Sequence, residues 1–352
     1  MTAGPVSPMI SYHLRRVRAA RTGLVERSLA GRARARPARP GSTDPIRAAR
    51  TRHKWYEIIG LAGPAAVVFT LFVLVPIGFA GYYSLYKWSG YGWPTEFIGL
   101  DNYFGPYGAF HDPIFLDGLR NNAFILVGSL LIQGPLAIAI ALLLNRHFRG
   151  RAVFRMLVFV PYVLAEVTVG IMWQLLLQPD GGMDALLTRL GLEQFIRGWL
   201  GELDVVLWTM LFILTWKYTG FALILFLAGL SNIPDELSEA AAIDGASWWQ
   251  TQRYVTLPLL GPTIRIWMFL SMIGSLQLFD VIWVASTPAV RSLGASNTMA
   301  TYMVDHGFNQ REWGYGNAVA AILFVLSFLA AVLFQRIVLR RDTEGAQTRG
   351  AA

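Results

Sequence analysis

The sequence has no cysteine among its 352 residues and only three lysines. Without cysteine, no disulfide framework, thiolate metal site or cysteine nucleophile can form. A phosphate-binding loop of the Walker type needs a lysine followed by serine or threonine. Lys54 and Lys87 are followed by tryptophan, however, and Lys217 is followed by tyrosine. The chain therefore has no nucleotide site of that type.

Signatures of metal binding and of nucleophilic catalysis are missing as well. The serines lack the setting of a nucleophile elbow, and the histidines show no spacing typical of zinc ligands. The five histidines are His13, His53, His111, His147 and His306. These absences argue against an enzyme, and we expect the chain to bind no metal and no cofactor.

Apolar residues, by contrast, make up 54% of the chain, above the roughly 45–50% of soluble domains. They are concentrated in six runs, each long enough to cross about 30 Å of hydrocarbon as a helix of about 20 residues. Continuous runs favour helices over a β-barrel, whose strands are shorter and alternate. The predicted fold is an all-α integral membrane protein with six transmembrane helices. The predicted spans are Ile58–Gly81, Asn122–Leu144, Phe154–Leu177, Val205–Leu230, Ile264–Thr287 and Asn317–Leu339.

Basic residues are distributed unevenly around these runs. The first 56 residues carry 13 arginines and lysines, and three more arginines lie between the second and third runs. The stretch 180–204 has two basic residues against five acidic ones. Because basic loops remain in the cytoplasm, the pattern places both termini, and the loop at about 231–258, on the cytoplasmic side of a multi-pass protein.

The N-terminal segment, residues 1–56, is rich in arginine, alanine and proline and has no apolar periodicity. Such a composition buries too little apolar surface to fold alone. We interpret it as a disordered cytoplasmic tail held near anionic lipid, at about 1 kcal/mol per basic residue close to the surface. A nucleic-acid partner is not expected for a tail anchored to a membrane. Residues 341–352 form a second cytoplasmic tail.

The cytoplasmic loop contains the stretch "EAAAIDGASWWQTQRYVTLP" (Glu239 to Pro258). Pro234 suits the start of a short helix, and Gly245 is a natural C-terminal stop. A second helix at about Ser247–Val255 is expected to stop at Leu257-Pro258. Two short helices at an angle make a protrusion that can dock in a cleft of a partner. The alternative is a helix pair lying on lipid through Trp248 and Trp249.

This stretch resembles the signature loop of the permeases of binding-protein-dependent ABC importers. That signature is Glu-Ala-Ala, three residues, Gly, nine residues, Ile or Val, one residue, and Leu-Pro. The matching residues here are Glu239, Ala240, Ala241, Gly245, Val255, Leu257 and Pro258, with Asp244 in the same loop. The resemblance implies that the loop docks on a separate ATPase subunit and couples ATP hydrolysis to transport.

Further stretches resemble the sugar branch of that family, the maltose- and glycerol-phosphate-type permeases. They are "FIGLDNY" (97–103), "GLRNN" (118–122), "FVPYVLAEVTVGIMWQLLL" (159–177), "LAGLSNIPDELSEAA" (227–241) and "LFDVIWV" (278–284). The resemblance implies a type-1 permease fold with one helix and an outer loop at 57–118 and five helices at 119–340. The implied localisation is the bacterial plasma (inner) membrane.

The implied function is import of a sugar or oligosaccharide. The implied partners are a second permease subunit, giving a heterodimer, a cytoplasmic ATPase dimer, an extracytoplasmic sugar-binding protein, the sugar and the lipid bilayer. An importer of glycerol phosphate or a related polar solute is the alternative within the family. A membrane scaffold or channel without an energy source is the alternative outside it, and it leaves the signature loop unexplained.

Ionisable groups inside spans are costly and point to function. Glu166 and Lys217 lie near mid-depth of the predicted spans three and four, where they either pair or line the path. Gln277 and Asp280 share a helical face by their spacing of three, and Trp283 continues that side. We expect these three residues to face the translocation cavity and Asp280 to contact sugar hydroxyls. Aromatic surface for a sugar is added by Trp173, Trp216 and Tyr218.

Deletion of residues 1–50 is expected to leave sugar uptake largely intact, because this segment has no apolar face with which to pack. The measurement is initial uptake rate per membrane-inserted complex, with abundance determined by immunoblot. Loss of uptake at unchanged abundance would show that the tail has a role in transport.

Overall fold

The computed structural model describes residues 56, 59–146 and 148–339. The described chain divides into two units between Thr70 and Leu71. The predicted N-terminal tail, apart from Tyr56, and the predicted C-terminal tail lie outside the described residues. In the first unit, residues 59–69 are helical.

The described residues contain five helices that are long and apolar enough to span a membrane, and a sixth candidate that is bent. This confirms the predicted class of an all-α membrane protein. The first helix is Ile59–Tyr83, which includes η1 (Thr70–Leu74) and α3 (Val75–Tyr83), and the second is Pro113–Asn145, which comprises α5 (Pro113–Gly128), η3 (Ser129–Gln133) and α6 (Gly134–Asn145). The third is α10 (Val206–Ser231), and the fourth is Trp248–Leu276, which comprises α12 (Trp248–Thr251), η5 (Gln252–Thr256) and α13 (Leu257–Leu276). The fifth is Trp313–Val338, most of which is α17 (Trp313–Phe334).

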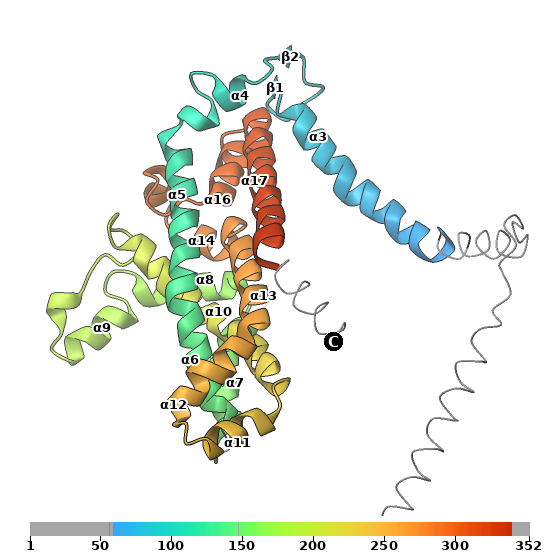
Figure 1. The fold of residues 1–352 in the computed structure, drawn as a ribbon. Coiled ribbons are helices and arrows are strands. Elements are labelled where there is room, and N and C mark those ends of the chain that lie inside the picture. The colour runs from blue at the N-terminus through green and yellow to red at the C-terminus, as the bar shows by residue number, and fades with distance from the viewer. Residues whose placement is uncertain (1–55, 57–58, 147, 340–352) are drawn as a thin grey trace, which may run out of the picture. The chain divides into compact units, whose positions relative to one another are not determined.

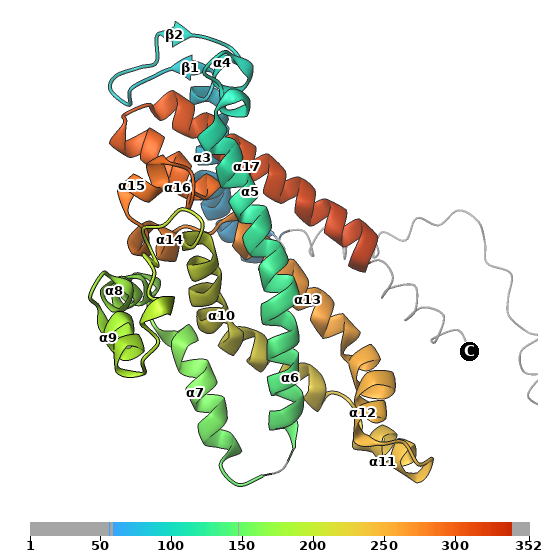
Figure 2. The same cartoon turned by 90° about the vertical axis from the view of Figure 1, so that its left-hand side faces the viewer.

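The predicted span Phe154–Leu177 is wrong as a continuous helix. It consists of α7 (Arg151–Val163) and α8 (Glu166–Leu177), which meet at an angle of 97°. Leu164 and Ala165 at the junction have extended backbone angles. Pro161 lies inside α7, where its missing N–H and its ring weaken the turn that precedes it. Figure 2 shows α8 turning away from α7 toward α9.

The predicted span Ile264–Thr287 is also broken. Helix α13 ends at Leu276, and the short helix α14 (Asp280–Ala285) begins after an irregular Phe279. The break frees carbonyl groups at the end of α13. The Asn122 side chain of α5 donates to the carbonyls of Ser275 at 2.5 Å and Leu276 at 3.4 Å. The buried amide of a neighbouring helix therefore satisfies the end of the first half-helix.

Helix α10 lies between two groups of helices and has buried residues along its whole length. One apolar cluster joins it to α8 and α14, and a second joins it to α6 and α13. Gly170 of α8 packs so closely on Val284 of α14 that an added Cβ would lie 2.7 Å from the valine Cβ. The two half-helices that follow the breaks thus pack directly against each other.

The loops gather at two ends of the second unit. Helices α11 (Asp235–Ile243) and α12 lie at one end, while the strands β1 (Tyr86–Lys87) and β2 (Glu96–Phe97) and helix α4 (Asp101–Phe104) lie at the other (Figure 1). Tyr86 pairs with Phe97 and Lys87 with Glu96 in an antiparallel hairpin. The remaining elements are η2 (Ala109–His111), α9 (Gly182–Arg189), η4 (Glu193–Phe195), α15 (Pro288–Ser292), α16 (Met299–Val304), η6 (Asp305–Asn309) and η7 (Gln335–Leu339).

Candidate functional site

The signature loop begins with α11, and its end confirms the predicted role of Gly245 as a helix stop. Gly245 has a φ of +81°, a left-handed conformation that glycine adopts without steric cost. The Gly245 N–H donates to the Ala242 carbonyl at 3.1 Å, and the Ala246 N–H donates to the Ala241 carbonyl at 2.9 Å. This paired arrangement is the Schellman motif. It fixes the direction in which the chain leaves α11.

The second predicted helix of the loop does not stop at Leu257-Pro258. Helix α12 starts at a capping box in which Ser247 and Gln250 bond to each other's backbone N–H groups, and it continues through η5 into α13. The reason lies in the wide turn of η5, where the Leu257 N–H donates to the Gln252 carbonyl. Pro258 then falls in the first turn of α13, where its missing N–H is tolerated. The signature loop is therefore joined to a membrane span without a flexible joint.

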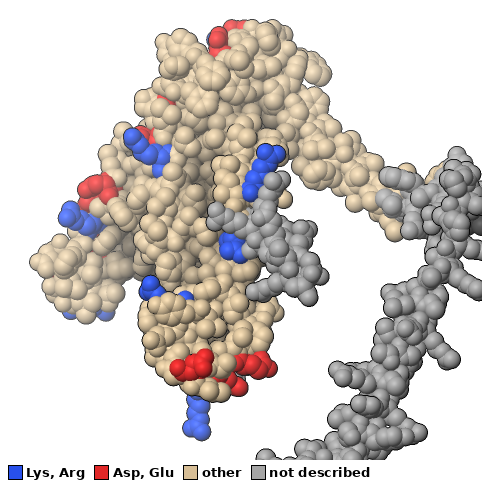
Figure 3. Space-filling view, viewed as in Figure 1, with Lys and Arg blue, Asp and Glu red and all other residues tan. Residues whose placement is uncertain are grey.

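The outer surface of α11 is acidic with one apolar side chain at its end. Ile243 is 87% exposed. The exposed acidic residues are Asp235, Glu236, Glu239 and Asp244. Acidic side chains are visible at this end of the molecule in Figure 3. Such a surface suits a partner with a basic rim and an apolar pocket.

The loop between α6 and α7 reaches the same end of the molecule. The Arg146 guanidinium lies 4.1 Å from the centre of the Trp248 ring, a cation–π contact. Both loops are predicted to be cytoplasmic, and their proximity agrees with that topology. Because Trp248 is engaged by Arg146, Trp249, which is 61% exposed, is the tryptophan left for contact with lipid or a partner.

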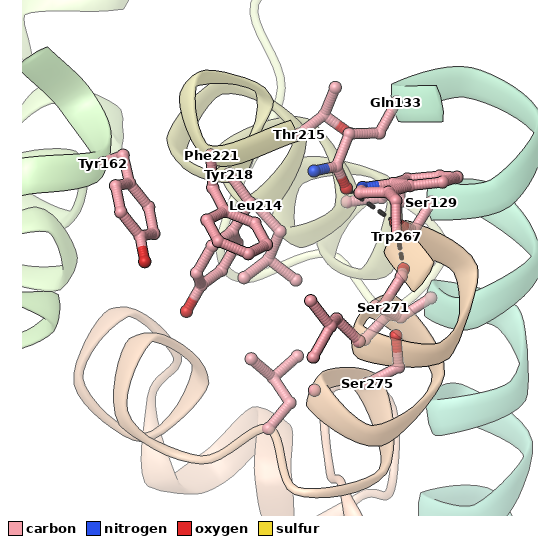
Figure 4. A pocket seen from close by; sticks show the side chains of 15 residues that line it. Ser129, Gln133, Tyr162, Leu214, Thr215, Tyr218, Phe221, Trp267, Ser271 and Ser275 are labelled. Carbon is pink, nitrogen blue, oxygen red and sulfur yellow. Dashed lines mark hydrogen bonds between the residues drawn. The ribbon is translucent and has the colours of Figure 1, made fainter. Parts of the chain in front are cut away.

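A cavity of about 210 Å³ lies among the spans, beside the middle of α10 and the C-terminal half of α13. Its polar wall comes mainly from η3 and α13, and its aromatic wall mainly from α7 and α10 (Figure 4). The lining residues are Ile125, Ser129, Gln133, Tyr162, Leu211, Leu214, Thr215, Tyr218, Phe221, Trp267, Leu270, Ser271, Gly274, Ser275 and Leu278. The cavity thus combines hydroxyl and amide groups with several aromatic rings.

The polar side chains of this wall form a short chain of hydrogen bonds. The Ser129 Oγ lies 2.6 Å from the Gln133 Oε1 and 2.8 Å from the Ser271 Oγ, as the dashed lines in Figure 4 show. Across the cavity, Tyr162 and Phe221 are 5.3 Å apart between ring centres. Hydroxyl and amide groups can bond to sugar hydroxyls, and the aromatic faces can cover sugar C–H groups.

Of the predicted path residues, Tyr218 lines this cavity and Glu166 lies beside it. The Tyr218 hydroxyl donates to the Glu166 carboxylate at 2.7 Å. Lys217 pairs with the same carboxylate at 4.0 Å, but its own side chain is only 1% exposed. Its ammonium donates to the Leu164 carbonyl at 2.8 Å. Lys217 therefore pairs with Glu166 and stabilises the break between α7 and α8, and it does not line the cavity.

Trp173 and Trp216 pack in the apolar cluster around α8, α10 and α14. Trp173 is 7% exposed, and its ring stands edge-on to that of Trp216 at 5.4 Å. Neither lines the described cavity. That Trp173 and Trp216 contact the sugar stays a prediction, and their positions outside the cavity lining do not support it.

The prediction that Gln277 and Asp280 share a helical face is wrong. Gln277 caps α13 outside the helix, and Asp280 is the first residue of α14. Trp283 is covered by the Arg291 guanidinium, whose carbon lies 4.2 Å from the ring centre. Arg291 also donates to the Trp283 and Ser286 carbonyls at 3.0 and 2.6 Å. Burial of this guanidinium lowers the pKa of Arg291, and the charge of Asp305 opposes that shift.

Asp280→Asn is expected to reduce sugar uptake per assembled complex, because Asp280 is exposed at the start of α14 and a charged acceptor contributes about 1.5–3 kcal/mol to a hydrogen bond. Asp280→Leu should reduce it further. The assembled complex in the membrane is quantified for both variants. Wild-type turnover in both would exclude contact between Asp280 and the substrate, whereas loss of assembly at normal turnover would indicate a packing role.

The sequence analysis missed Ser129, Gln133, Tyr162, Trp267 and Ser271. Ser129 and Gln133 lie four residues apart in one span, a spacing that places two polar groups on one helical face. That signal was available in the sequence. The pairing of Ser129 with Ser271 was not, since 142 residues separate them.

Broken spans beside a cavity that carries a few polar groups recur in membrane transport proteins. The family model of the binding-protein-dependent transport system inner membrane component matches residues 133–342. The chain belongs to this family.

Named relatives agree with this assignment. The chain is 30% identical, over 83% of its length and 85% of the relative's, to the diacetylchitobiose uptake system permease protein NgcF of Streptomyces coelicolor. It is 32% identical, over 75% and 88%, to the multiple sugar-binding transport system permease protein MsmF of Streptococcus mutans. Among solved structures, a bacterial ABC transporter that imports the acidic polysaccharide alginate matches 83% of this chain and 99% of its own, with a TM-score of 0.69 and 23% identity. This structural likeness shows that the two chains share a fold.

Proposed function

We propose that this chain is the membrane-spanning permease subunit of an ATP-driven importer. It translocates a sugar or oligosaccharide that an extracytoplasmic binding protein delivers. The observation that supports this most is the cavity among the spans, whose hydroxyl, amide and aromatic groups suit a sugar. The named relatives transport diacetylchitobiose or multiple sugars, which supports the same substrate class.

ATP hydrolysis takes place on a separate cytoplasmic ATPase dimer, since this sequence has no Walker-type phosphate loop. The acidic end of α11 docks on that dimer, and a second permease completes the membrane part as a heterodimer. Closure of the ATPase dimer moves α11. Because α12, η5 and α13 are continuous, the movement reaches Trp267 and Ser271 in the cavity wall.

Both termini and the signature loop lie on the cytoplasmic side in this proposal, and the binding protein docks on the opposite side. One solved structure of the alginate transporter contains a periplasmic protein bound to an alginate pentasaccharide, which supports such a partner here. A channel without an energy source would not account for the signature loop or for membership of a binding-protein-dependent family.

The test is uptake of labelled oligosaccharides by cells with and without the gene for this chain. We expect that loss of the gene abolishes uptake of at least one oligosaccharide and that a plasmid copy restores it. A matched copy carrying Gly191→Val, a change in an outer loop, should restore it too. Unchanged uptake of every sugar in the deletion strain, with uptake of another solute class lost, would overturn the proposed substrate class.

A further inference from the structure

A second cavity, the outer cavity, lies at the end of α10 that is opposite to the signature loop. Helix α10 ends at Ser231, shortly before α11, and the outer cavity lies beside its start at Val206. The cavity has a volume of about 280 Å³, and the first turns of α5 and the loop after α15 complete its wall. Its lining includes the side chains of Asp117, Arg120, Asn121, Asp204 and Trp208. In the proposed orientation, it faces the side on which the binding protein docks.

The outer cavity lies one helical turn away from the cavity that Ser129 and Ser271 line, the inner cavity. In α5, Asn121 lines the outer cavity and Ile125 lines the inner one. In α10, Leu207 and Leu211 have the same relation. Residues four apart lie on one face of a helix, and four residues span about 6 Å of its axis. The two cavities therefore follow each other along the same faces of α5 and α10.

The outer cavity has side chains that suit a sugar. Trp208 is 59% exposed, and its ring stands edge-on to that of Phe124, with 4.8 Å between the ring centres. The exposed indole can cover the C–H groups of a sugar ring. Arg120 and Asp117 form an ion pair at 3.3 Å, and Asp204 is exposed in the same wall. A guanidinium group can donate to sugar hydroxyls, and carboxylates can accept from them.

Hydrogen bonds between distant parts of the chain hold the wall of the outer cavity in place. The buried Asn121 amide donates to the carbonyls of Gly294 and Asn297, both at 2.8 Å. Gly294 has a φ of +81°, and an added Cβ there would lie 2.8 Å from the Asp117 Oδ2. The loop after α15 is therefore held close against α5, beside the ion pair. A wall that is fixed before the solute arrives lowers the entropic cost of binding.

Buried apolar side chains stand between the two cavities. On α5 and α10, the lining residues of the inner cavity that lie nearest the outer one are Ile125 and Leu211, and both are buried. Leu211 packs so closely on Gly128 of α5 that an added Cβ would lie 2.6 Å from the leucine Cδ2. A solute in the outer cavity can therefore reach the inner cavity only when α5 and α10 move apart at this contact.

We propose that the outer cavity is a second sugar site, which holds the sugar released by the binding protein before α5 and α10 admit it to the inner cavity. Trp208 covers one sugar ring, while the Arg120–Asp117 pair and Asp204 bond to its hydroxyls. This inference rests on the proposed sugar-import function and adds to it a site outside the cavity among the spans.

The test is photolabelling of the purified complex of both permeases and the ATPase, without the binding protein. The probes are maltose, cellobiose and N,N′-diacetylchitobiose, each carrying a diazirine group, and mass spectrometry of peptides locates the label. We expect at least one probe to label the segments 117–124 or 203–208 of this chain. An excess of the same disaccharide without the diazirine should suppress that labelling.

Two substitutions make the test specific to the outer cavity. Trp208→Ala removes the aromatic surface and should reduce the suppressible labelling by at least about fivefold. Arg120→Gln removes the charged donor from a largely exposed position and should reduce it by at least about twofold. The matched control is Trp93→Ala, the same substitution at a tryptophan that is exposed in the loop between β1 and β2, and it should leave the labelling unchanged.

The affinity of the sugar-loaded binding protein for the complex is measured with the same variants and should not change. Loss of that affinity in Trp208→Ala at unchanged labelling would assign the outer cavity to contact with the binding protein and overturn the inference. Absence of suppressible labelling in a system that transports sugar would also overturn it and leave the proposed importer intact. If the complete system transports no sugar, the proposed function itself fails, and this inference fails with it.

Discussion

The Gly245→Val variant is expected to assemble with its partners but to lose at least about tenfold of its ATP-driven sugar uptake. Gly245 adopts a φ of +81° and carries the Schellman motif that ends α11. A left-handed conformation costs an ordinary L-residue about 1–2 kcal/mol, and a β-branched residue tolerates it least. The chain after α11 must then take another direction, and the acidic end of α11 no longer fits the ATPase while α12 is held by Arg146.

The measurement compares uptake with ATP hydrolysis in the same vesicles. Hydrolysis that continues while uptake falls identifies uncoupling. Gly191→Val is the matched control, because Gly191 also has a positive φ, +68°, and open space around it, in the loop after α9. Its uptake should stay near wild type. Normal uptake by Gly245→Val would show that the signature loop does not couple ATP hydrolysis to transport.

Lys217→Met is expected to destabilise the permease by about 2–3 kcal/mol and to reduce uptake in proportion to the folded protein lost. The change leaves the Leu164 carbonyl without its donor and Glu166 without its cation. An unsatisfied buried acceptor costs about 1–3 kcal/mol. Breaking a fully buried ion pair costs about 3–5 kcal/mol. Because Glu166 is 36% exposed, the loss of its cation contributes less than that to the destabilisation.

Thermal unfolding of the purified protein in detergent checks this expectation. The control is Lys87→Met, the same substitution at an exposed lysine. Lys87→Met should unfold at the wild-type temperature. If Lys217→Met also does so, Lys217 does not stabilise the break between α7 and α8, and a direct role in the path would have to be reconsidered.

Hydropathy predicted where the chain crosses the membrane but not where the spans break. The junctions at Leu164–Ala165 and at 277–279 carry little that distinguishes them from a helix in a sliding window. They exist because distant side chains satisfy the freed carbonyls: Lys217 for Leu164, and Asn122 for Ser275 and Leu276. Such long-range partners cannot be inferred from local pattern.

Local chemistry predicted the signature loop better. Gly245 stops α11 as expected, because a glycine after a short alanine-rich helix needs only its own backbone geometry. The predicted end of the second helix was wrong, because the wide turn before Pro258 accommodates this proline within the helix. The cavity was predicted only through Tyr218 and the neighbouring Glu166. Ser129 of η3, which bonds to Gln133 in the same span, gains its place in the cavity wall by meeting Ser271 of α13.

The continuous helix Trp248–Leu276 explains how a cytoplasmic event reaches the cavity. From Trp248 to Ser271 the axial distance is about 35 Å at 1.5 Å per residue. The signature loop adjoins the N-terminal end of this continuous helix, and Trp267 and Ser271 lie in the cavity wall near its C-terminal end. A displacement of α11 can therefore change the cavity without an intermediate domain.

The central claim is that this chain moves sugar only when ATP hydrolysis drives it and a binding protein delivers the sugar. The most direct measurement is accumulation of a labelled neutral oligosaccharide in proteoliposomes that contain this chain, its companion permease and the ATPase, with ATP and the loaded binding protein supplied on opposite sides. We predict accumulation against a gradient only when all components and ATP are present, and at least about tenfold less accumulation when this chain carries Gly245→Val. Equal sugar passage without ATP or without the binding protein would contradict the account and indicate a channel.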